Sequence, residues 1–454
     1  MLRGATKFLT ATSYVNPETQ VFTTYAGDAS NMISISHWDW NDKINIPEPT
    51  FERYYTHHKG PITNLVFNPV KDEMVSASWD RTIVVQKAST GDEIMAMRGH
   101  TDFIKDLHPL GDRVFVTSSA DAELRWWDTK EGTCIATRGK SEEEGHTRSI
   151  ESIAVVPLRT AHTTKASYAV FSTGSDRRII LWLVSFTPDA PADIEVKFIA
   201  ATTRKVEGGL KPIHETTIWH ITANESMLVS ASADYSAKIW SIERVIALLE
   251  DDTDPRDTFA EAFRVEEKSA GAEDATRWNP NSMSVAAMKA ALATAPMPQL
   301  DGLVHDDWVT RTCIDQEAGH VYTASRDGVI KQWSLAGEPI KAIKVRSEGA
   351  VRGSMASGED DSKQISSMQV VKWRGKKYVV ISSHDATIQL IPTDFKPFEP
   401  KIEKTAEEPK EEKEEDDDDF DLDEDDLPDE VKEMQRQRFL AMMRGGSCMG
   451  SCRK

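Results

Sequence analysis

The chain has 454 residues with a formal net charge of −20, and 39% of its residues are hydrophobic. No window approaches the roughly 20 consecutive apolar residues that a membrane-spanning helix needs, and no long apolar stretch near Met1 marks a secretory signal. Four cysteines are too few for a disulfide framework in a chain of this length, which predicts a reducing compartment: the cytoplasm, with the nucleus also allowed. These features exclude membrane proteins, secreted disulfide scaffolds and collagen-like fibres.

One short pattern recurs seven times along the chain. A strand-like run of small and β-branched residues reaches an Asp, and a second alternating run follows; the strongest copies span 75–83 and 229–240. Because Asp can hydrogen-bond its own backbone in a tight turn, each copy predicts a β-hairpin. The seven aspartates are Asp28, Asp80, Asp121, Asp176, Asp234, Asp327 and Asp385.

Three further columns stand near fixed offsets from this Asp. A Trp follows it by six positions in four copies, a hydroxyl residue precedes it by four in six copies, and a His lies 20 to 30 positions upstream in five copies. The first, second and seventh copies lack this Trp and carry Ser34, Gln86 and Ile391 in its place. The complete sets are His100, Thr117, Asp121 and Trp127; His146, Ser172, Asp176 and Trp182; His214, Ser230, Asp234 and Trp240; and His305, Thr323, Asp327 and Trp333.

In these columns the chain resembles the WD-repeat β-propeller family over roughly residues 7–400. The resemblance implies an all-β fold, a seven-bladed propeller of four-stranded antiparallel blades occupying residues 1–400. It also implies that the four side chains of each complete set form a buried hydrogen-bonded chain within their blade. A His–hydroxyl–Asp set could instead suggest a hydrolase, but a catalytic set is needed once per active site and this one recurs. We therefore expect these residues to hold the blades rather than to perform chemistry.

Signals for enzymatic or cofactor chemistry are weak. The sequence contains no phosphate-binding Gly-rich loop, no His-Glu-x-x-His motif and no Cys-x-x-Cys pair. Cys448 and Cys452 have the right chemistry for a thiol pair, but no second pair completes a zinc site. We predict a protein that is not an enzyme, with no catalytic residues, cofactor or metal. An enzyme site assembled in a central channel from several blades stays open as an alternative.

An insertion separates the fifth copy from the sixth, at about 247–303. It is predicted to be partly helical: 282–293 reads as a short Ala-rich helix with a hydroxyl cap, and 244–250 as another helical turn. Such an insertion either contributes to partner binding or is a tolerated loop excursion. The closure of the seventh blade is also open, because either 395–402 or the N-terminus could supply its last strand.

The region 401–454 is predicted to be a disordered acidic tail. Between Glu403 and Glu430 it holds 18 acidic residues against three lysines, and it cannot bury enough apolar surface to order itself. A short helix at 429–444 would fold against a partner or against the propeller, or the segment stays disordered. This charge disfavours binding to nucleic acids and favours basic partners.

The resemblance implies that the loops carrying the repeat His and Asp lie on the narrower face of the ring, a common docking surface for proteins. Aromatic and Arg side chains dominate interface energetics, so the side chains beside those anchors are candidate partner contacts. They are Trp79, Phe103, Lys105, Trp219, Trp308, Arg311, Arg326 and His384.

We predict a non-enzymatic scaffold or adaptor that mediates protein–protein interactions in a multiprotein complex. The first alternative is a chaperone-like binder of a basic protein, a histone or a ribosomal protein, through the acidic tail. A substrate receptor that presents clients to a ligase cannot be distinguished from a general scaffold by sequence. No membrane partner is expected.

Overall fold

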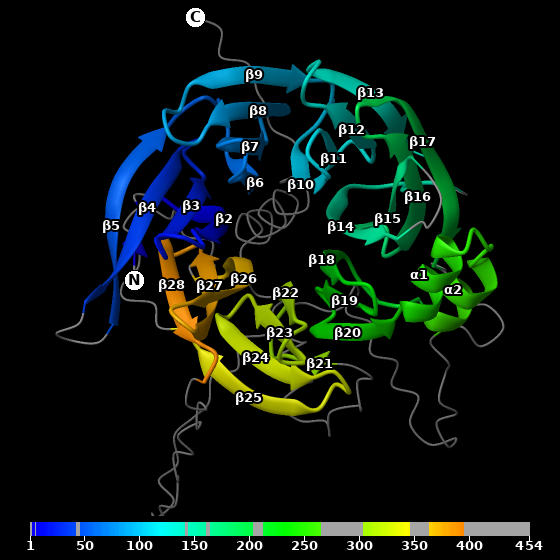
Figure 1. The fold of residues 1–454 in the computed structure, drawn as a ribbon. Helices are drawn as coiled ribbons and strands as arrows, with labels where there is room; N and C mark the ends of the chain where they lie inside the picture. Colours follow the sequence, from blue (N-terminus) through cyan, green and yellow to red (C-terminus); the bar gives the residue numbers. More distant parts are fainter. Residues whose placement is uncertain are drawn as a thin grey trace, which may run out of the picture. The chain divides into compact units, whose positions relative to one another are not determined.

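Seven four-stranded antiparallel sheets form a ring in the computed structural model (Figure 1). The predicted all-β, seven-bladed propeller is thereby confirmed. All described residues belong to one compact unit, Met1–Glu399. The structure describes residues 2–4, 6–41, 46–140, 144–159, 164–202, 212–264, 303–345 and 363–394.

Several predictions from the sequence fall outside these described residues. They concern the helix at 282–293, the tail 401–454 with its helix at 429–444, and the two cysteines Cys448 and Cys452.

In each blade consecutive strands pair with one another, and the first of them lies innermost. The last blade differs in that its outer strand comes from the N-terminus. Blade 1 contains β2 (Phe8–Val15), β3 (Phe22–Asp28), β4 (Ile33–Asn41) and β5 (Ile46–Tyr55). Blade 2 contains β6 (Ile62–Asn68), β7 (Glu73–Ser78), β8 (Thr82–Lys87) and β9 (Glu93–Arg98). Blade 3 contains β10 (Ile104–Leu110), β11 (Val114–Ser119), β12 (Leu124–Asp128) and β13 (Thr133–Arg138).

The remaining blades follow in chain order. Blade 4 contains β14 (Ile150–Leu158), β15 (Ala166–Gly174), β16 (Ile179–Thr187) and β17 (Ala190–Ala201). Blade 5 contains β18 (Ile218–Ala223), β19 (Met227–Ser232), β20 (Ser236–Ser241) and β21 (Leu303–Val304). Blade 6 contains β22 (Val309–Asp315), β23 (His320–Ser325), β24 (Val329–Ser334) and β25 (Pro339–Lys344). Blade 7 contains β26 (Ile365–Trp373), β27 (Lys376–Ser383), β28 (Thr387–Pro392) and β1 (Leu2–Arg3).

The hydrophobic core lies between blades, so each sheet is covered on both faces. All six residues of β11 are buried, as expected for a strand covered on both faces. Successive side chains of a strand point to opposite faces. Val116 accordingly packs with Ile153 of blade 4, whereas its neighbour Phe115 packs with Ala77 of blade 2.

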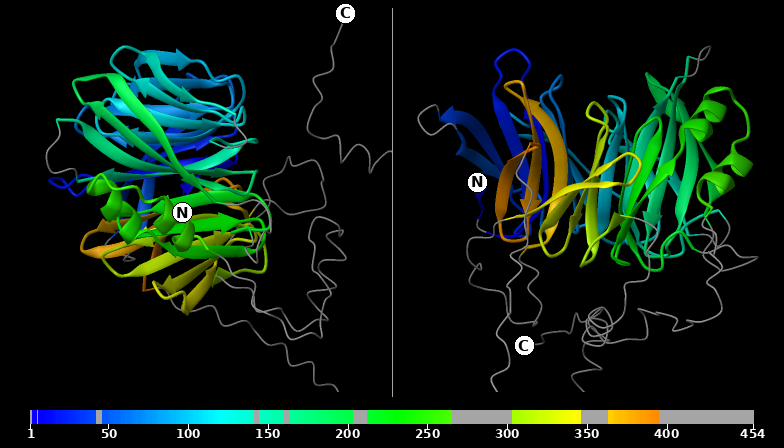
Figure 2. Two further views of the ribbon diagram at one scale, coloured as in Figure 1. Left: turned by 90° about the vertical axis from the view of Figure 1, so that its right-hand side faces the viewer. Right: turned by 90° about the horizontal axis from the view of Figure 1, so that it is seen from below.

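Two helices occupy the start of the insertion, between β20 and β21. The predicted turn at 244–250 is confirmed as α1 (Glu243–Glu250), and α2 (Arg256–Ala262) follows it against β17 at the outer edge of the ring (Figure 2). Sequence reasoning missed α2 because its seven residues carry a single large apolar side chain, the buried Phe259. Among the described residues, no helix is long and apolar enough to cross a membrane.

The N-terminus closes the ring. β1 pairs antiparallel with β28, placing Leu2 opposite Ile388 and Arg3 opposite Thr387. The backbone amide of Gly4 then donates to the carbonyl of Ala386 at 2.7 Å. Of the two closures that the sequence left open, the N-terminal one is observed, and blade 7 combines strands from both ends of the propeller.

Deleting residues 1–6 should destabilise the whole ring, because blade 7 loses its outer strand and its backbone hydrogen bonds. We expect the free energy of unfolding to fall by about 2 kcal/mol, given about 1 kcal/mol for each lost bond. Urea denaturation of the deletion variant measures this loss. A Gly-Ser extension placed before Met1 is the matched control, since it keeps β1 and should leave stability unchanged; equal stability of deletion and control would contradict this closure.

Candidate functional site

The complete set of blade 3 is a continuous hydrogen-bonded chain. The Trp127 indole donates to the Thr117 hydroxyl at 2.8 Å, the hydroxyl lies 2.8 Å from Nε2 of His100, and Nδ1 of His100 lies 2.9 Å from Asp121. Because the hydroxyl oxygen accepts from the indole, its proton is available to Nε2. Nδ1 of His100 then carries the ring proton and donates it to Asp121.

The same three bonds recur in blades 4 and 5, at 2.8 to 3.0 Å. They join His146, Ser172, Asp176 and Trp182 in blade 4, and His214, Ser230, Asp234 and Trp240 in blade 5.

Blade 6 brings its four residues together differently. His305 Nε2 lies 2.6 Å from the Thr323 hydroxyl, which accepts from the Trp333 indole at 2.7 Å. Nδ1, however, bonds the Ser325 hydroxyl at 3.0 Å, and that hydroxyl donates to Asp327 at 2.5 Å. The His therefore reaches its Asp through an intervening serine rather than directly.

The charged end of the chain is strongly stabilised in the blades with a direct bond. Burial alone would raise the pKa of the Asp121 carboxyl, but the hydrogen bond from His100 and those from two backbone amides outweigh burial and hold the pKa at about 2. The same balance lowers the pKa of Asp176 and Asp234. In blade 6 the histidine carries the shift, because burial and the nearby Lys331 lower the pKa of His305 to about 3.

These sets do not have the geometry of a hydrolase. The hydroxyl that would act as nucleophile is 0% exposed in each of the four complete sets, so no substrate can reach it. It also already accepts the indole proton. We infer that the sets fix each blade's loops, as expected from their recurrence. The four hydroxyls are those of Thr117, Ser172, Ser230 and Thr323.

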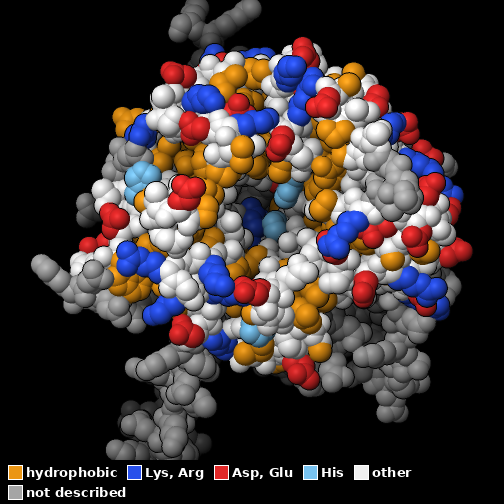
Figure 3. Space-filling view, viewed as in Figure 1, with side chains coloured by type: hydrophobic (Ala, Val, Ile, Leu, Met, Phe, Trp, Pro, Cys, Tyr) orange, Lys and Arg blue, Asp and Glu red, His pale blue; other side chains and the backbone are white. Residues whose placement is uncertain are grey.

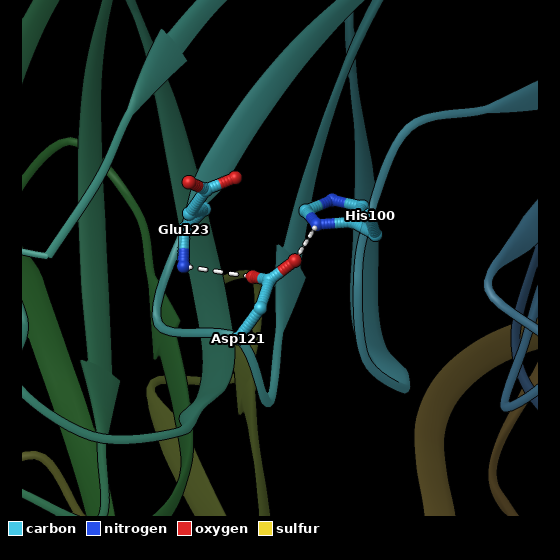
Figure 4. A group of neighbouring side chains, drawn as sticks. All are labelled: His100, Asp121 and Glu123. Atoms are coloured by element: carbon cyan, nitrogen blue, oxygen red, sulfur yellow. Dashed lines mark hydrogen bonds and ion pairs between the residues drawn. The ribbon is translucent and has the colours of Figure 1, made fainter.

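Together with His100 and Asp121 of the blade 3 set, the carboxylate of Glu123 forms a group of side chains that could in principle hold a metal ion. Ligand atoms of His100, Asp121 and Glu123 all lie within 4.8 Å of one another (Figure 4). The Glu123 carboxylate, however, pairs with Arg125 at 2.7 Å, and the Glu123 backbone amide donates to Asp121 at 2.9 Å. With both nitrogens of His100 also engaged, the blade's own hydrogen bonds account for the grouping.

Blade 1 corrects one prediction. We expected Ser34 where other copies carry a Trp, but Trp38 supplies the indole and donates to Thr24 at 3.0 Å. The Trp has the same strand register in blades 1 and 3. Trp38 pairs with Phe22, two residues before Thr24, and Trp127 pairs with Phe115, two residues before Thr117. A longer hairpin moves this Trp away from the expected offset.

Blade 2 keeps the histidine bonds without an indole. His58 bonds Ser76 at 2.8 Å and Asp80 at 3.1 Å. Gln86 occupies the Trp position at 0% exposure, and neither atom of its amide has a hydrogen-bond partner. A buried amide without partners costs free energy.

Five of the eight candidate partner contacts form two aromatic clusters, each with at least one exposed ring. In the first, which we call the Trp79 cluster, Trp79 and Phe103 are 38% and 44% exposed, and their rings stack at 5.2 Å with an angle of 20°. They come from blades 2 and 3. In the second, the Trp308 cluster, Trp308 is 36% exposed, Arg326 lies 4.8 Å above its ring, and Trp219 lies 6.3 Å away.

Five candidates are less exposed than expected. Trp219, Arg326, His384, Lys105 and Arg311 are all half-buried. Lys105 pairs with Glu151 at 3.3 Å, so its charge is already compensated on the propeller. Arg311 donates to two backbone carbonyls.

Sequence reasoning missed a polar column on the innermost strands. It stands six positions after each repeat His, and this fixed offset could have revealed it. Its members in blades 2 to 6 are Asn64, Asp106, Ser152, His220 and Arg311.

Replacing Gln86 with Met should stabilise the protein, because Met fills a similar volume without a polar group that needs partners. We expect about 1 kcal/mol of added stability, measured by urea denaturation. Gln332→Met is the matched control: this buried amide nitrogen lies 2.8 Å from His320, so its loss should destabilise. Destabilisation of equal size in both variants would show that Gln86 has partners after all.

Blade 6 should make stability sensitive to mild acid. A histidine in the unfolded chain takes up a proton near pH 6.5, whereas folded His305 does so only near pH 3. Its contribution is therefore complete above pH 6.5 and declines as the pH falls towards 3, by about 2 kcal/mol at pH 5. His305→Gln, which keeps an acceptor and a donor without titrating, should flatten the dependence of unfolding free energy on pH between 7.5 and 5; an unchanged slope would refute this assignment.

The family profile described as WD domain, G-beta repeat matches four segments of the chain. They are residues 49–85, 91–128, 211–241 and 300–334. These segments contain the repeat histidines of blades 2, 3, 5 and 6.

Several known proteins are similar in sequence to parts of this chain. Mitochondrial division protein 1 of Mycosarcoma maydis is 38% identical over 71 residues, covering 16% of this chain and 9% of that protein. Nuclear distribution protein PAC1 of Arthroderma otae is 20% identical over 219 residues, which cover 47% of this chain and 43% of that protein. SIR4-interacting protein SIF2 of Saccharomyces cerevisiae is 29% identical over 124 residues, which cover 25% of this chain and 23% of that protein. The chain thus spans less than half the length of each of these relatives. The chain therefore contains WD repeats, and the four matched segments lie on a β-propeller of seven four-stranded blades.

Proposed function

We propose that this protein is a non-enzymatic scaffold that docks protein partners on the face carrying the Trp79 and Trp308 clusters. WD-repeat proteins are generally scaffolds for protein interactions, and one relative, SIR4-interacting protein SIF2, is named for an interaction with another protein. Both clusters sit where a hairpin turn meets the start of an innermost strand, since Trp79 donates its amide to Pro61 and Arg326 donates its amide to Trp308.

The stacked pair of the Trp79 cluster is the observation that carries this proposal. Two large aromatic side chains from adjacent blades remain more than one third exposed although they touch each other. The fold gains little from such exposure, whereas a partner that covers the pair would bury a large apolar area. Trp and Arg are also the residue types most enriched at interface hot spots, and the Trp308 cluster offers both.

Two clusters on different parts of the ring suit a partner that crosses the central opening. The Trp79 cluster belongs to blades 2 and 3, and the Trp308 cluster to blades 5 and 6. Arg326 stacks on Trp308 at 4.8 Å, which presents its guanidinium beside an aromatic surface and allows polar contacts at the edge of the buried area.

The double variant Trp79→Ala and Phe103→Ala should weaken binding of the chief protein partner by at least about 2 kcal/mol, roughly 30-fold in affinity, as expected for hot-spot aromatics. Affinity purification of the full chain from cells, followed by quantitative mass spectrometry, identifies the partner and measures its loss. The matched control is Ile94→Ala with Ile340→Ala, which removes exposed apolar side chains, 44% and 46% exposed, from the outer strands β9 and β25. Equal retention of partners by both double variants would contradict docking at the Trp79 cluster.

The acidic tail motivates the alternative, a chaperone-like binder of a basic protein in the cytoplasm or nucleus. Its support is the composition of Glu403–Glu430, with 18 acids against three lysines, which attracts basic surfaces. Deleting 401–454 separates the two functions. A scaffold retains its chief partner after the deletion, whereas a chaperone of this type loses it.

A further inference from the structure

A ring of polar side chains lines the innermost strands at one register position. In each blade this residue follows directly after the irregularity that opens the innermost strand, as Asp106 does opposite Ser118 and Arg311 does opposite Ala324. The seven residues are Thr10, Asn64, Asp106, Ser152, His220, Arg311 and Ser367.

Most of this polar ring has a structural use. At four junctions the ring side chain accepts the backbone amide of the next blade's innermost strand, at 2.8 to 3.3 Å. These bonds join neighbouring blades around the channel. The acceptor and donor residues are Asp106 and Ile153, Ser152 and Ile221, His220 and Thr312, and Ser367 and Ala11.

Arg311 cannot make this bond, because a guanidinium has no acceptor. It instead donates Nε to the Ser366 carbonyl at 2.5 Å and Nη1 to the Thr310 carbonyl at 2.7 Å. These two bonds fix the plane of the guanidinium. Within the described ranges, no carboxylate lies at ion-pair distance from it.

The acids whose charges act on Arg311 are already engaged elsewhere. Burial lowers the pKa of Arg311, and the charges of Asp106 and Glu151 oppose this only in part. Asp106 accepts from the Ser152 hydroxyl at 3.0 Å and the Ile153 amide at 2.8 Å. Glu151 is paired with Lys105 at 3.3 Å. A half-buried guanidinium thus lacks a counter-ion of its own, which is costly unless an anion supplies one.

The neighbouring His220 adds a second donor. Its Nδ1 accepts the Thr312 amide at 3.3 Å, so the ring proton resides on Nε2. Burial and the charge of Arg311 lower the pKa of His220 to about 3, which keeps this imidazole a neutral N–H donor at physiological pH. Figure 3 shows Lys or Arg and His side chains inside the hollow at the centre of the ring.

We propose that Arg311 and His220 form an oxyanion-binding site in the central channel. A planar guanidinium held by two carbonyls presents its remaining N–H groups in the geometry that suits carboxylate or phosphate oxygens. The imidazole N–H of His220, on the innermost strand of the adjacent blade, adds a second donor. The ligand is a carboxylate or phosphate group on a molecule or side chain narrow enough to enter the channel, and this inference does not depend on the aromatic clusters.

Thermal unfolding of the full chain in phosphate or in glutarate, each compared with chloride at equal ionic strength, tests the site. We expect at least one of the two oxyanions to raise the melting temperature by about 2 °C or more, and the stronger of the two identifies the source of the oxyanion. Arg311→Met should abolish the shift. The matched control is Arg326→Met, which removes a guanidinium outside the channel and should keep it.

Two further variants make the outcome decisive. Arg311→Lys keeps the charge but loses the fork, so it should weaken anion binding about tenfold even if the Met variant folds poorly. His220→Phe should weaken it without removing the charge. If neither oxyanion shifts the melting temperature beyond chloride, or if Arg311→Lys and Arg326→Met respond alike, the channel holds no such site.

Discussion

No sheet of this ring can bury both of its faces alone, and the rest of the structure follows from that constraint. Phe115 and Val116 are adjacent in β11 yet pack against different neighbouring blades, so every blade depends on two others. The dependence continues around the ring until β1 pairs with β28. In blades 3 to 6 a hydrogen-bonded chain centred on a fully buried hydroxyl then fixes the blade internally, where a thin core provides few other constraints.

The propeller has two groups of polar residues, the His–hydroxyl–Asp–Trp sets and the polar ring on the innermost strands. They differ in whether hydrogen-bond donors are left without a protein partner among the described residues. In the His–hydroxyl–Asp–Trp sets every donor finds an acceptor within the blade, so nothing is left for a ligand. On the innermost strands the same register position joins blades at Asp106, Ser152 and Ser367. At Arg311 the same position carries a guanidinium that bonds two carbonyls, forms no ion pair among the described residues and stands beside His220 of the adjacent blade.

Sequence predicted the ring because its columns are local: the Asp, hydroxyl and Trp of a hairpin lie within about ten residues and repeat. Sequence reasoning failed for features whose residues do not stand at a fixed offset or lie far apart along the chain. Trp38 escaped a search at a fixed offset because its hairpin is longer. The Ser325 relay depends on side-chain rotamers, which the pattern does not encode. The channel pair joins β18 to β22 across the insertion, so only the folded ring brings His220 near Arg311.

Proton exchange of the indole N–H groups, followed by NMR, tests the account most directly. The indoles of Trp127, Trp182, Trp240 and Trp333 donate to buried hydroxyls, so they should exchange only through unfolding of the ring, at similar slow rates. The indole of Trp79, which is 38% exposed, should exchange rapidly. Rapid exchange of any of the four buried indoles, at a rate like that of Trp79, would contradict a ring held by these internal bonds.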